Sequence, residues 1–291
     1  MITGAGGQVG ACLCDQGAKR GHRVHGLRHH ELDVTDSKAV ENVIALIEPD
    51  VVVNAAAYTA VDKAEQEQEL SYAVNHNGAA HLASACRDAG VPMVHLSTDY
   101  VFDGSKPCAY TEDDPIAPLG VYGTSKAAGE AAVRNTCDTH IILRTAWVFS
   151  ATGQNFVRTM LKLAGERDTL RVVADQTGCP SYAGDIAGAV LDILPQMGQG
   201  KWGTYHYCGE PAVSWHGFAE AIVEEARAFM PVRVQSIEAI ETKDYPTPAA
   251  RPANSVLDCS RIEAAFGIRP ANWRAALPKV IRELSGVRRE K

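Results

Sequence analysis

The sequence predicts an α/β fold, with a doubly wound parallel sheet and a smaller interleaved C-terminal lobe. Three observations predict it. Strand-like and helix-like segments alternate through the first half, a glycine-rich turn follows the first strand, and the pattern changes after residue 150. We therefore expect two parts, residues 1–150 and residues 151–291, with some segments of the second returning to the core of the first.

The individual elements follow from local patterns. A β-branched run, DVVVN at 50–54, is typical of a buried parallel strand. Asp36 or Ser37 is a suitable N-cap for a helix, and Gly90 is a suitable C-cap. The expected strands cover 1–3, 22–27, 50–54, 91–97, 140–144, 170–174 and 204–208. The expected helices cover 8–21, 37–47, 65–89, 122–135, 155–164, 186–194 and 214–229.

Composition excludes several function classes. Apolar residues make up 46% of the chain and charged residues 22%, as in an ordinary globular protein. The formal net charge of −7 argues against a nucleic-acid partner, and no apolar run is long enough to cross a membrane. The eight cysteines are scattered without a CxxC pair, which favours a reducing cytoplasm and no structural metal site.

The segment ITGAGGQVG at 2–10 indicates a dinucleotide site. Gly4, Gly7 and Gly10 follow a strand and open a helix. Glycine at these positions permits a tight turn and a close approach of backbone to pyrophosphate, and the helix N-terminus offers free N–H groups. We expect a Rossmann-type fold over residues 1–150, with Gln8 and Val9 also at the cofactor.

The tip of the second strand bears on the choice of dinucleotide. An acidic residue there would favour NADH, but the chain has Arg28, which suits a 2′-phosphate. NADPH is therefore the expected cofactor, with NADH tolerated. In the alternative reading Arg28 is a solvated surface residue. Asp33 and Val34 are expected at the adenine edge.

The first strand is short. Only three residues precede Gly4, whereas a typical strand has about five or six. We expect the natural start of the chain to lie several residues upstream of Met1.

A proton-handling group is predicted where one strand ends and the next helix begins. Tyr122 and Lys126 are one helical turn apart, so both lie on one helix face. A lysine ammonium close to the phenol would lower its pKa from about 10 and make proton transfer practical near neutrality. Thr98 ends the preceding strand and can hydrogen-bond a reacting carbonyl.

These residues and several longer motifs carry a resemblance that covers nearly the whole chain. The chain resembles the dTDP-4-dehydrorhamnose reductase family of the extended short-chain dehydrogenase/reductase superfamily. The glycine loop and YxxxK are shared by the superfamily, while the other motifs are more specific. The motifs are GAGGQVG at 4–10, NAAAYTAVDKAE at 54–65, AVN at 73–75, STDYVFDG at 97–104, YGTSKAAGE at 122–130, RTAWVFS at 144–150, DQTGCPSY at 175–182 and RPANSVLD at 251–258.

The resemblance implies that hydride from NADPH or NADH reduces C4 of dTDP-4-dehydro-β-L-rhamnose. Tyr122 would protonate the alkoxide, Thr98 would hold the carbonyl, and Lys126 would tune Tyr122 and fix the ribose. The cofactor would also be bordered by Ala55, Ala56, Ala57, Tyr58 and Asn75.

The resemblance also implies a set of substrate residues. Asp99 and Trp147 would border the sugar, with a core aromatic as the alternative for Trp147. Arg251 would bind the diphosphate, because a guanidinium fork suits phosphate oxygens. Asn155 and Asn254 would read hydroxyls. For these last three the alternative is a polar contact that shapes a loop.

Two other functions stay open at this point. One is an epimerase or dehydratase for another nucleotide sugar, although Tyr100 stands where the dehydratase pattern has a glutamate. The other is a non-catalytic NADP-binding subunit like the β subunit of methionine adenosyltransferase. A homodimer is also left open. A metal seen between some family members is not expected here, because Asp15 is the only acid in the first helix.

Overall fold

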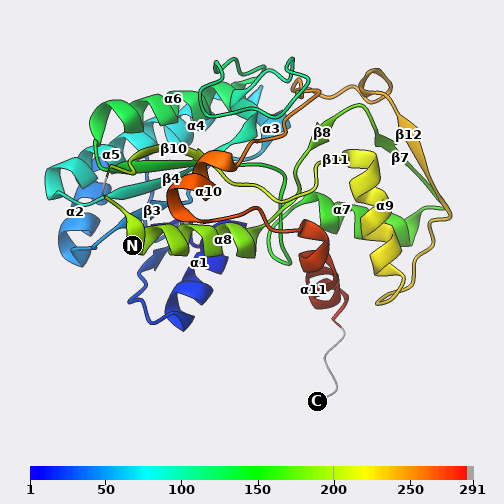
Figure 1. Cartoon of the computed structure of the whole chain (residues 1–291), viewed down its shortest axis with the longest axis horizontal. Coiled ribbons are helices and arrows are strands. Elements are labelled where there is room, and N and C mark those ends of the chain that lie inside the picture. The colour runs from blue at the N-terminus through cyan, green and yellow to red at the C-terminus, as the bar shows by residue number, and fades with distance from the viewer. Residues whose placement is uncertain (199, 287–291) are drawn as a thin grey trace.

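The computed structural model describes residues 1–198 and 200–286, and its centre is a six-stranded parallel sheet (Figure 1). The strand order is β10-β5-β4-β3-β1-β2, which confirms the predicted doubly wound fold. From β1 the strand order continues to β2 on one side and to β3 and the remaining strands on the other. In such folds ligands bind at this switch point, at the carboxyl ends of β1 and β3. The strands are β1 (Ile2–Thr3), β2 (Gly26–Leu27), β3 (Val52–Asn54), β4 (Met93–Thr98), β5 (His140–Thr145) and β10 (Gly203–His206).

Helices cover both faces of this sheet. Figure 1 shows α2, α5 and α6 on one side and α1 with α8 on the other. Asp36 caps α2 by accepting from two backbone N–H groups, and Gly90 ends α5 in the left-handed conformation, as expected. The bounds are α1 (Gln8–Lys19), α2 (Ser37–Ile47), α5 (Gly78–Ala89), α6 (Val121–Thr136) and α8 (Ala183–Ile193).

The helix predicted over 65–89 is confirmed from residue 68 onward, where α4 (Gln68–Tyr72), the π-helical turn η1 (Ala73–Asn77) and α5 follow one another without a break. Its first three residues, 65–67, are not helical and follow a separate short helix, α3 (Val61–Ala64). Glu65 lies outside the helices because its Oε1 accepts from the backbone N–H of Val121, 2.8 Å away, at the start of α6. A contact distant in sequence therefore overrides local helix propensity here.

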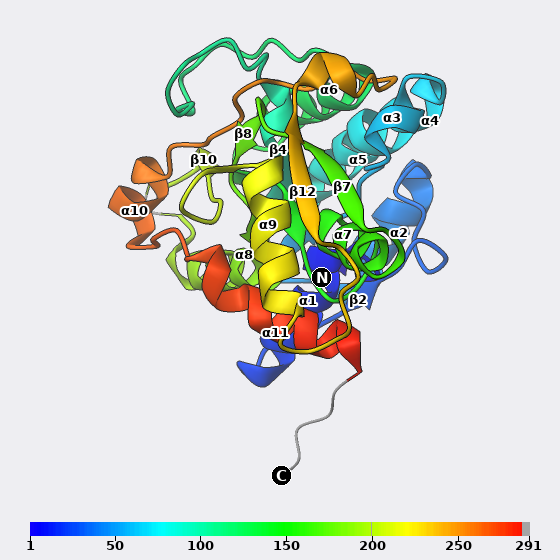
Figure 2. The same cartoon turned by 90° about the vertical axis from the view of Figure 1, so that its right-hand side faces the viewer.

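The smaller lobe faces the viewer in Figure 2, where α7, α9 and α11 surround the β7–β12 pair. Phe149, Phe218 and Trp273 are fully buried at its core. The chain leaves this lobe to form α8 and β10, which pack on α1 and β5. The boundary near 150 stays a prediction, and 287–291 lie outside the described residues. The lobe's elements are α7 (Phe156–Glu166), β7 (Thr169–Val173), α9 (Trp215–Ala226), β12 (Ser236–Ile240) and α11 (Trp273–Ser285).

Shorter elements connect these layers. Two further pairs, parallel β6–β9 and antiparallel β8–β11, join the lobe to the sheet domain. Among the described residues, no helix is both long and apolar enough to cross a lipid bilayer. The remaining elements are η2 (Asp99–Val101), β6 (Val148–Phe149), β8 (Thr177–Gly178), β9 (Ser181–Tyr182), η3 (Leu194–Gln196), β11 (Val213–Ser214), η4 (Thr242–Asp244) and α10 (Ser260–Phe266).

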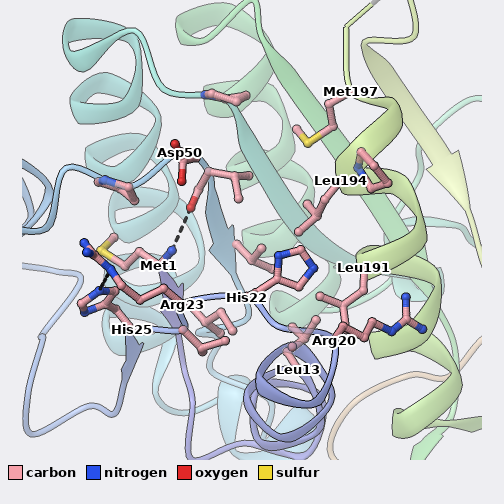
Figure 3. Close-up of a pocket in the computed structure, with 18 of the residues that line it drawn as sticks. Met1, Leu13, Arg20, His22, Arg23, His25, Asp50, Leu191, Leu194 and Met197 are labelled. Carbon is pink, nitrogen blue, oxygen red and sulfur yellow. Dashed lines mark hydrogen bonds between the residues drawn. The ribbon is translucent and has the colours of Figure 1, made fainter.

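A cavity of about 640 Å³ opens at the amino ends of the strands, opposite the glycine loop. Figure 3 shows Met1 at its edge, with the terminal ammonium donating to the carbonyl of Val51 at 2.8 Å. Leu13 and Leu191 from α1 and α8 line its apolar side. β1 enters the sheet beside this cavity. The expectation of residues upstream of Met1 stays a prediction.

Candidate functional site

A cleft of about 490 Å³ lies at the carboxyl ends of the strands. Its floor comes from the glycine loop and the turns after β3 and β4, and its far wall comes from the lobe. The three predicted catalytic residues, Thr98, Tyr122 and Lys126, all line it. Strand end and helix start therefore meet in one cleft, as the sequence indicated.

The glycine loop is packed too closely for other side chains. Gly4 has a φ of +67°, and a Cβ there would lie 2.5 Å from the carbonyl oxygen of Ala55. A Cβ on Gly10 would lie 2.8 Å from the carbonyl carbon of Gly4. The first turn of α1 thus leans directly on the loop, and the N-terminus of α1 stays open toward the cleft, where backbone N–H groups can meet phosphate. The close packing of α1 on the glycine loop is the arrangement expected of a dinucleotide site.

Tyr122 is held beside the end of β4. Its ring packs edge-on against Tyr100, with ring centroids 5.6 Å apart. Burial raises the pKa of Tyr122 to about 12; the Thr98 hydroxyl lowers it, and the Asp99 charge raises it further. In this form of the protein the phenol therefore carries its proton, as a proton donor must.

Lys126 takes a position that the sequence did not predict. Its Nζ donates to the carbonyl of Leu96 at 2.7 Å and lies 3.4 Å from Nε2 of His95, so it is directed beneath the cleft floor. Burial lowers the pKa of Lys126 to about 8. The expected lowering of the Tyr122 pKa by Lys126 is not seen in this arrangement, because the ammonium is turned toward β4.

Two buried side chains, Asp99 and Thr145, line this cleft at the ends of β4 and β5. Oγ1 of Thr145 has no hydrogen-bond partner among the described residues. Burial raises the pKa of Asp99 to about 6, against the lowering by the hydroxyls of Ser255 and Thr98, of which Thr98 donates to Oδ1 at 3.0 Å. A buried polar atom without a partner is costly, so a ligand hydroxyl at this place would be stabilised. Thr145 was missed from the sequence.

An aromatic pair forms the far wall. The rings of Trp147 and Trp215 are stacked with centroids 3.4 Å apart and planes within 4°. Trp147 has a φ of +45°, an unusual value for a bulky residue. Trp147 borders the cleft, and its contact with the sugar stays a prediction. The sequence did not predict that Trp215, at the start of α9, lies at the cleft.

A second cavity of about 400 Å³ adjoins the cleft in the lobe, and the two share Tyr100 and Trp215. It combines apolar and aromatic side chains with three arginines. Arg251, predicted to bind phosphate, lies here and donates to Oδ2 of Asp62 at 2.8 Å. The other cationic and aromatic lining residues are Arg167, Arg171, Phe156 and Tyr245. Such a lining suits a nucleotide with its phosphates.

The predicted cofactor residues follow the cleft toward β2. Ala55 and Ala57 line it, with Gln8 and Val9, and Ala56 lies between them on the same turn. A Cβ on Gly6 would lie 3.7 Å from Cγ of Arg28, so the Arg28 stem passes over the loop. Asp33 is exposed, and Val34 is buried against Gly78. Their roles at the adenine stay predictions.

Two predicted cofactor residues are engaged with each other. The amide of Asn75 accepts from the backbone N–H of Tyr58 at 2.8 Å and donates to its carbonyl at 3.0 Å and to Ser125. Asn75 therefore holds the turn after β3 against α6, and its contact with the cofactor stays a prediction. The hydroxyl of Tyr58 donates to Glu67, away from the cleft floor.

The two predicted hydroxyl readers both make polar contacts that shape loops, and their role at the substrate stays a prediction. Asn155 caps α7 through the backbone N–H of Arg158, and its amide nitrogen donates to Gln8. Asn254 donates to the carbonyls of Lys106 and Cys108, outside both the cleft and the second cavity. The alternative reading, loop-shaping polar contacts, is the one that the structure supports for both.

Known proteins resemble this chain over nearly its whole length. The family model described as the RmlD substrate binding domain matches residues 1–285. A dTDP-4-dehydrorhamnose reductase from Aggregatibacter actinomycetemcomitans is 48% identical over 96% of this chain and 97% of its own length. The chain belongs to the dTDP-4-dehydrorhamnose reductase family.

Solved structures of this reductase family have the same fold as this chain. The crystal structure from Clostridium acetobutylicum has a TM-score of 0.91 and 36% identity, covering 96% of this chain and 97% of that one. The Bacillus anthracis reductase, solved in complex with NADP, has a TM-score of 0.90 and 34% identity, covering 97% and 98%. A Thermus thermophilus UDP-glucose 4-epimerase is 22% identical, with a TM-score of 0.79 over 98% of each chain, and shares the fold alone.

Proposed function

We propose that this chain is an NADPH-dependent reductase that converts dTDP-4-dehydro-β-L-rhamnose to dTDP-β-L-rhamnose and tolerates NADH. The observation that carries the proposal is the meeting of Thr98, Tyr122 and Lys126 in one cleft beside the glycine loop. Membership of the reductase family supports the choice of substrate.

The residues fit the cofactor. The first turn of α1 packs directly on the glycine loop, so its free N–H groups are placed to bind the pyrophosphate, and the Arg28 stem lies beside Gly6, from where its guanidinium would meet a 2′-phosphate. When bound, NADPH supplies the hydride. Lys126 fixes the ribose once its Nζ turns up from Leu96 into the cleft.

The chain's own residues then hold the ketone and move the proton. Thr98 donates a hydrogen bond to the C4 oxygen, which orients the carbonyl and stabilises the growing charge. Tyr122 gives its phenolic proton to that oxygen as it becomes an alkoxide. Thr145 has an unpaired oxygen at the cleft for a neighbouring sugar hydroxyl.

The second cavity takes the nucleotide in this proposal. The sugar ring lies against Trp147 and Trp215, and the diphosphate passes toward Arg251, which exchanges part of its ion pair with Asp62 for phosphate oxygens. The base lies among the aromatic and apolar residues of the cavity. Because the two cavities share Tyr100 and Trp215, one elongated substrate can occupy both.

The test is a coupled assay with freshly made dTDP-4-dehydrorhamnose and each nicotinamide cofactor. We expect loss of NADPH absorbance in proportion to the keto sugar added, and formation of dTDP-rhamnose. An epimerase or dehydratase would convert a sugar without net NADPH loss. A non-catalytic subunit would bind NADPH without consuming it. Either result would replace the proposed reaction.

We also propose that the enzyme acts in the cytoplasm, which is supported by eight cysteines that are all free thiols. Whether it forms the homodimer left open by the sequence is decided by sedimentation of the same preparation.

A further inference from the structure

The turn after β2 brings an acidic side chain back to the end of that strand. The backbone N–H groups of Glu31 and Leu32 both donate to the carbonyl of Arg28, at 2.9 and 3.0 Å. The carboxylate of Glu31 then folds back, and its Oε2 accepts from the backbone N–H of Arg28 at 2.8 Å. The sequence shows no acid next to Leu27, the last residue of β2, but the fold supplies one there.

The same strand end is packed against the glycine loop. The backbone N–H of Ala5 donates to the carbonyl of Leu27 at 3.0 Å, and the aliphatic stem of Arg28 borders Gly6. In Rossmann-type folds an acidic residue about 20 residues past the glycine loop binds the ribose 2′-hydroxyl from the end of the second strand. The turn of Glu31 places its carboxylate at this end.

The two opposite charges at the end of β2 do not pair with each other. Arg28 and Glu31 are both exposed, and the guanidinium of Arg28 makes no hydrogen bond or ion pair with any residue that the structure describes. Oε1 of Glu31 likewise accepts no hydrogen bond from this part of the chain. A cation and a carboxylate oxygen are therefore both available to a ligand at the end of β2.

The next acid along the chain is engaged differently. Oδ1 of Asp33 accepts from both the backbone N–H and the hydroxyl of Thr35, at 2.9 and 2.8 Å. Asp33 therefore shapes the turn that leads into α2, whereas Glu31 is the acid held at the strand end itself.

The two charges at the end of β2 suit different forms of the adenosine ribose. A carboxylate accepts a hydrogen bond from a 2′-hydroxyl but repels a 2′-phosphate. A guanidinium binds a 2′-phosphate through paired N–H groups. We propose that Glu31 is a specificity-determining residue that binds the 2′-hydroxyl of NADH, while Arg28 binds the 2′-phosphate of NADPH. The proposal rests on the proposed function and assigns its tolerance of NADH to one side chain.

The first test measures cofactor binding without turnover. NADPH and NADH are titrated separately, with no keto sugar present, by the fluorescence of the reduced nicotinamide. The variants are Glu31→Gln and Arg28→Met. Glutamine keeps an oxygen for the backbone N–H of Arg28, so it removes the charge and retains the turn. Methionine keeps an unbranched apolar stem beside Gly6.

The two variants should act on different cofactors. We expect Glu31→Gln to raise the Kd of NADH about fivefold and to leave the Kd of NADPH unchanged or lower, because a charge-assisted hydrogen bond is lost and a repulsion is removed. Arg28→Met should raise the Kd of NADPH about tenfold and leave that of NADH unchanged. Glu41→Gln removes an equal charge from exposed α2 and should change neither.

The outcomes separate this proposal from the proposed function. An unchanged Kd of NADH in Glu31→Gln, equal weakening of both cofactors, or a wild type that binds NADPH alone overturns the proposal. A wild type that binds neither dinucleotide refutes the proposed function instead.

The second test needs no variant for its main result. The wild type is titrated with NADH and with 2′-deoxy-NADH, which lacks the hydroxyl assigned to Glu31. We expect the deoxy cofactor to bind about fivefold more weakly, and the difference to disappear in Glu31→Ala, which has no carboxylate to lose. Equal binding of the two cofactors by the wild type, or a difference that persists in Glu31→Ala, overturns the proposal.

Discussion

Replacement of Gly10 by alanine tests the packing of the glycine loop. The new Cβ would lie 2.8 Å from the carbonyl carbon of Gly4 and 2.9 Å from Cα of Ala5, with the Gly4 oxygen closer still. All three atoms are backbone, so relief requires the loop to retreat by roughly 1 Å. We expect overpacking to lower the free energy of unfolding by about 1–3 kcal/mol, despite the better helix propensity of alanine.

The same movement should weaken the cofactor site. A displaced loop makes poorer contact with the pyrophosphate. A loss of about 1.4 kcal/mol of binding free energy raises the NADPH dissociation constant about tenfold. Urea unfolding followed by tryptophan fluorescence and a NADPH titration measure the two effects. The matched control is Gly165→Ala in α7, where a Cβ has no neighbour within 4 Å. It should gain up to about 1 kcal/mol and bind NADPH normally. A Gly10→Ala protein as stable and as tight-binding as the wild type would refute the reasoning.

Three further predictions concern single side chains. Tyr122→Phe should lower kcat by about 10²-fold or more with an unchanged NADPH dissociation constant, and unchanged kcat would remove Tyr122 from the chemistry. Arg251→Ala should raise KM more than it lowers kcat, because it removes the guanidinium that pairs with Asp62 and is proposed to bind the diphosphate; the opposite split in steady-state kinetics would place Arg251 at the reacting carbonyl. Glu130→Gln should lower the free energy of unfolding by about 3 kcal/mol, because it removes the charge that pairs with buried Arg144 at 2.7 Å. Although burial raises the pKa of Glu130, hydrogen bonds from Arg144 and other donors hold it below its usual value. The wild type should therefore be stabilised above about pH 4 and lose this advantage as pH falls through the folded pKa, and equal acid sensitivity of both proteins in urea unfolding would contradict this.

The fold was accessible from the sequence because its signals are local. The strand at 50–54 is a β-branched run, and the caps at Asp36 and Gly90 act on adjacent backbone. The helix predicted over 65–89 begins three residues later than expected for the opposite reason. Glu65 leaves the helix to cap α6 at Val121, a partner that no local pattern indicates.

The candidate site was accessible only in part. Thr98 and Tyr122 could be found because strand ends and helix starts converge at one edge of a parallel sheet. Asn155 and Asn254 were assigned to substrate because an amide reads hydroxyls, but the same chemistry caps a helix or holds a loop, and the sequence does not separate the two. Trp215 becomes visible only when α9 is placed against the cleft.

The direction of Lys126 shows a further limit. Helical spacing places Lys126 and Tyr122 on one face, as predicted, but spacing does not choose among the rotamers of a long side chain. The carbonyl of Leu96 and the imidazole of His95 make that choice here. Both belong to β4, so the partner of the lysine depends on how α6 is seated on the sheet.

The position of β10 has a consequence for biosynthesis. This outer strand completes the sheet against β5, yet it leaves the ribosome after α7, β7 and α8 have been made. Until then one side of β5 in the nascent chain has unpaired backbone N–H and C=O groups, which can pair with strands of other chains and cause aggregation. A fragment ending at residue 150 would keep that exposed border permanently, so the nucleotide-binding half should be expressed together with the rest of the polypeptide.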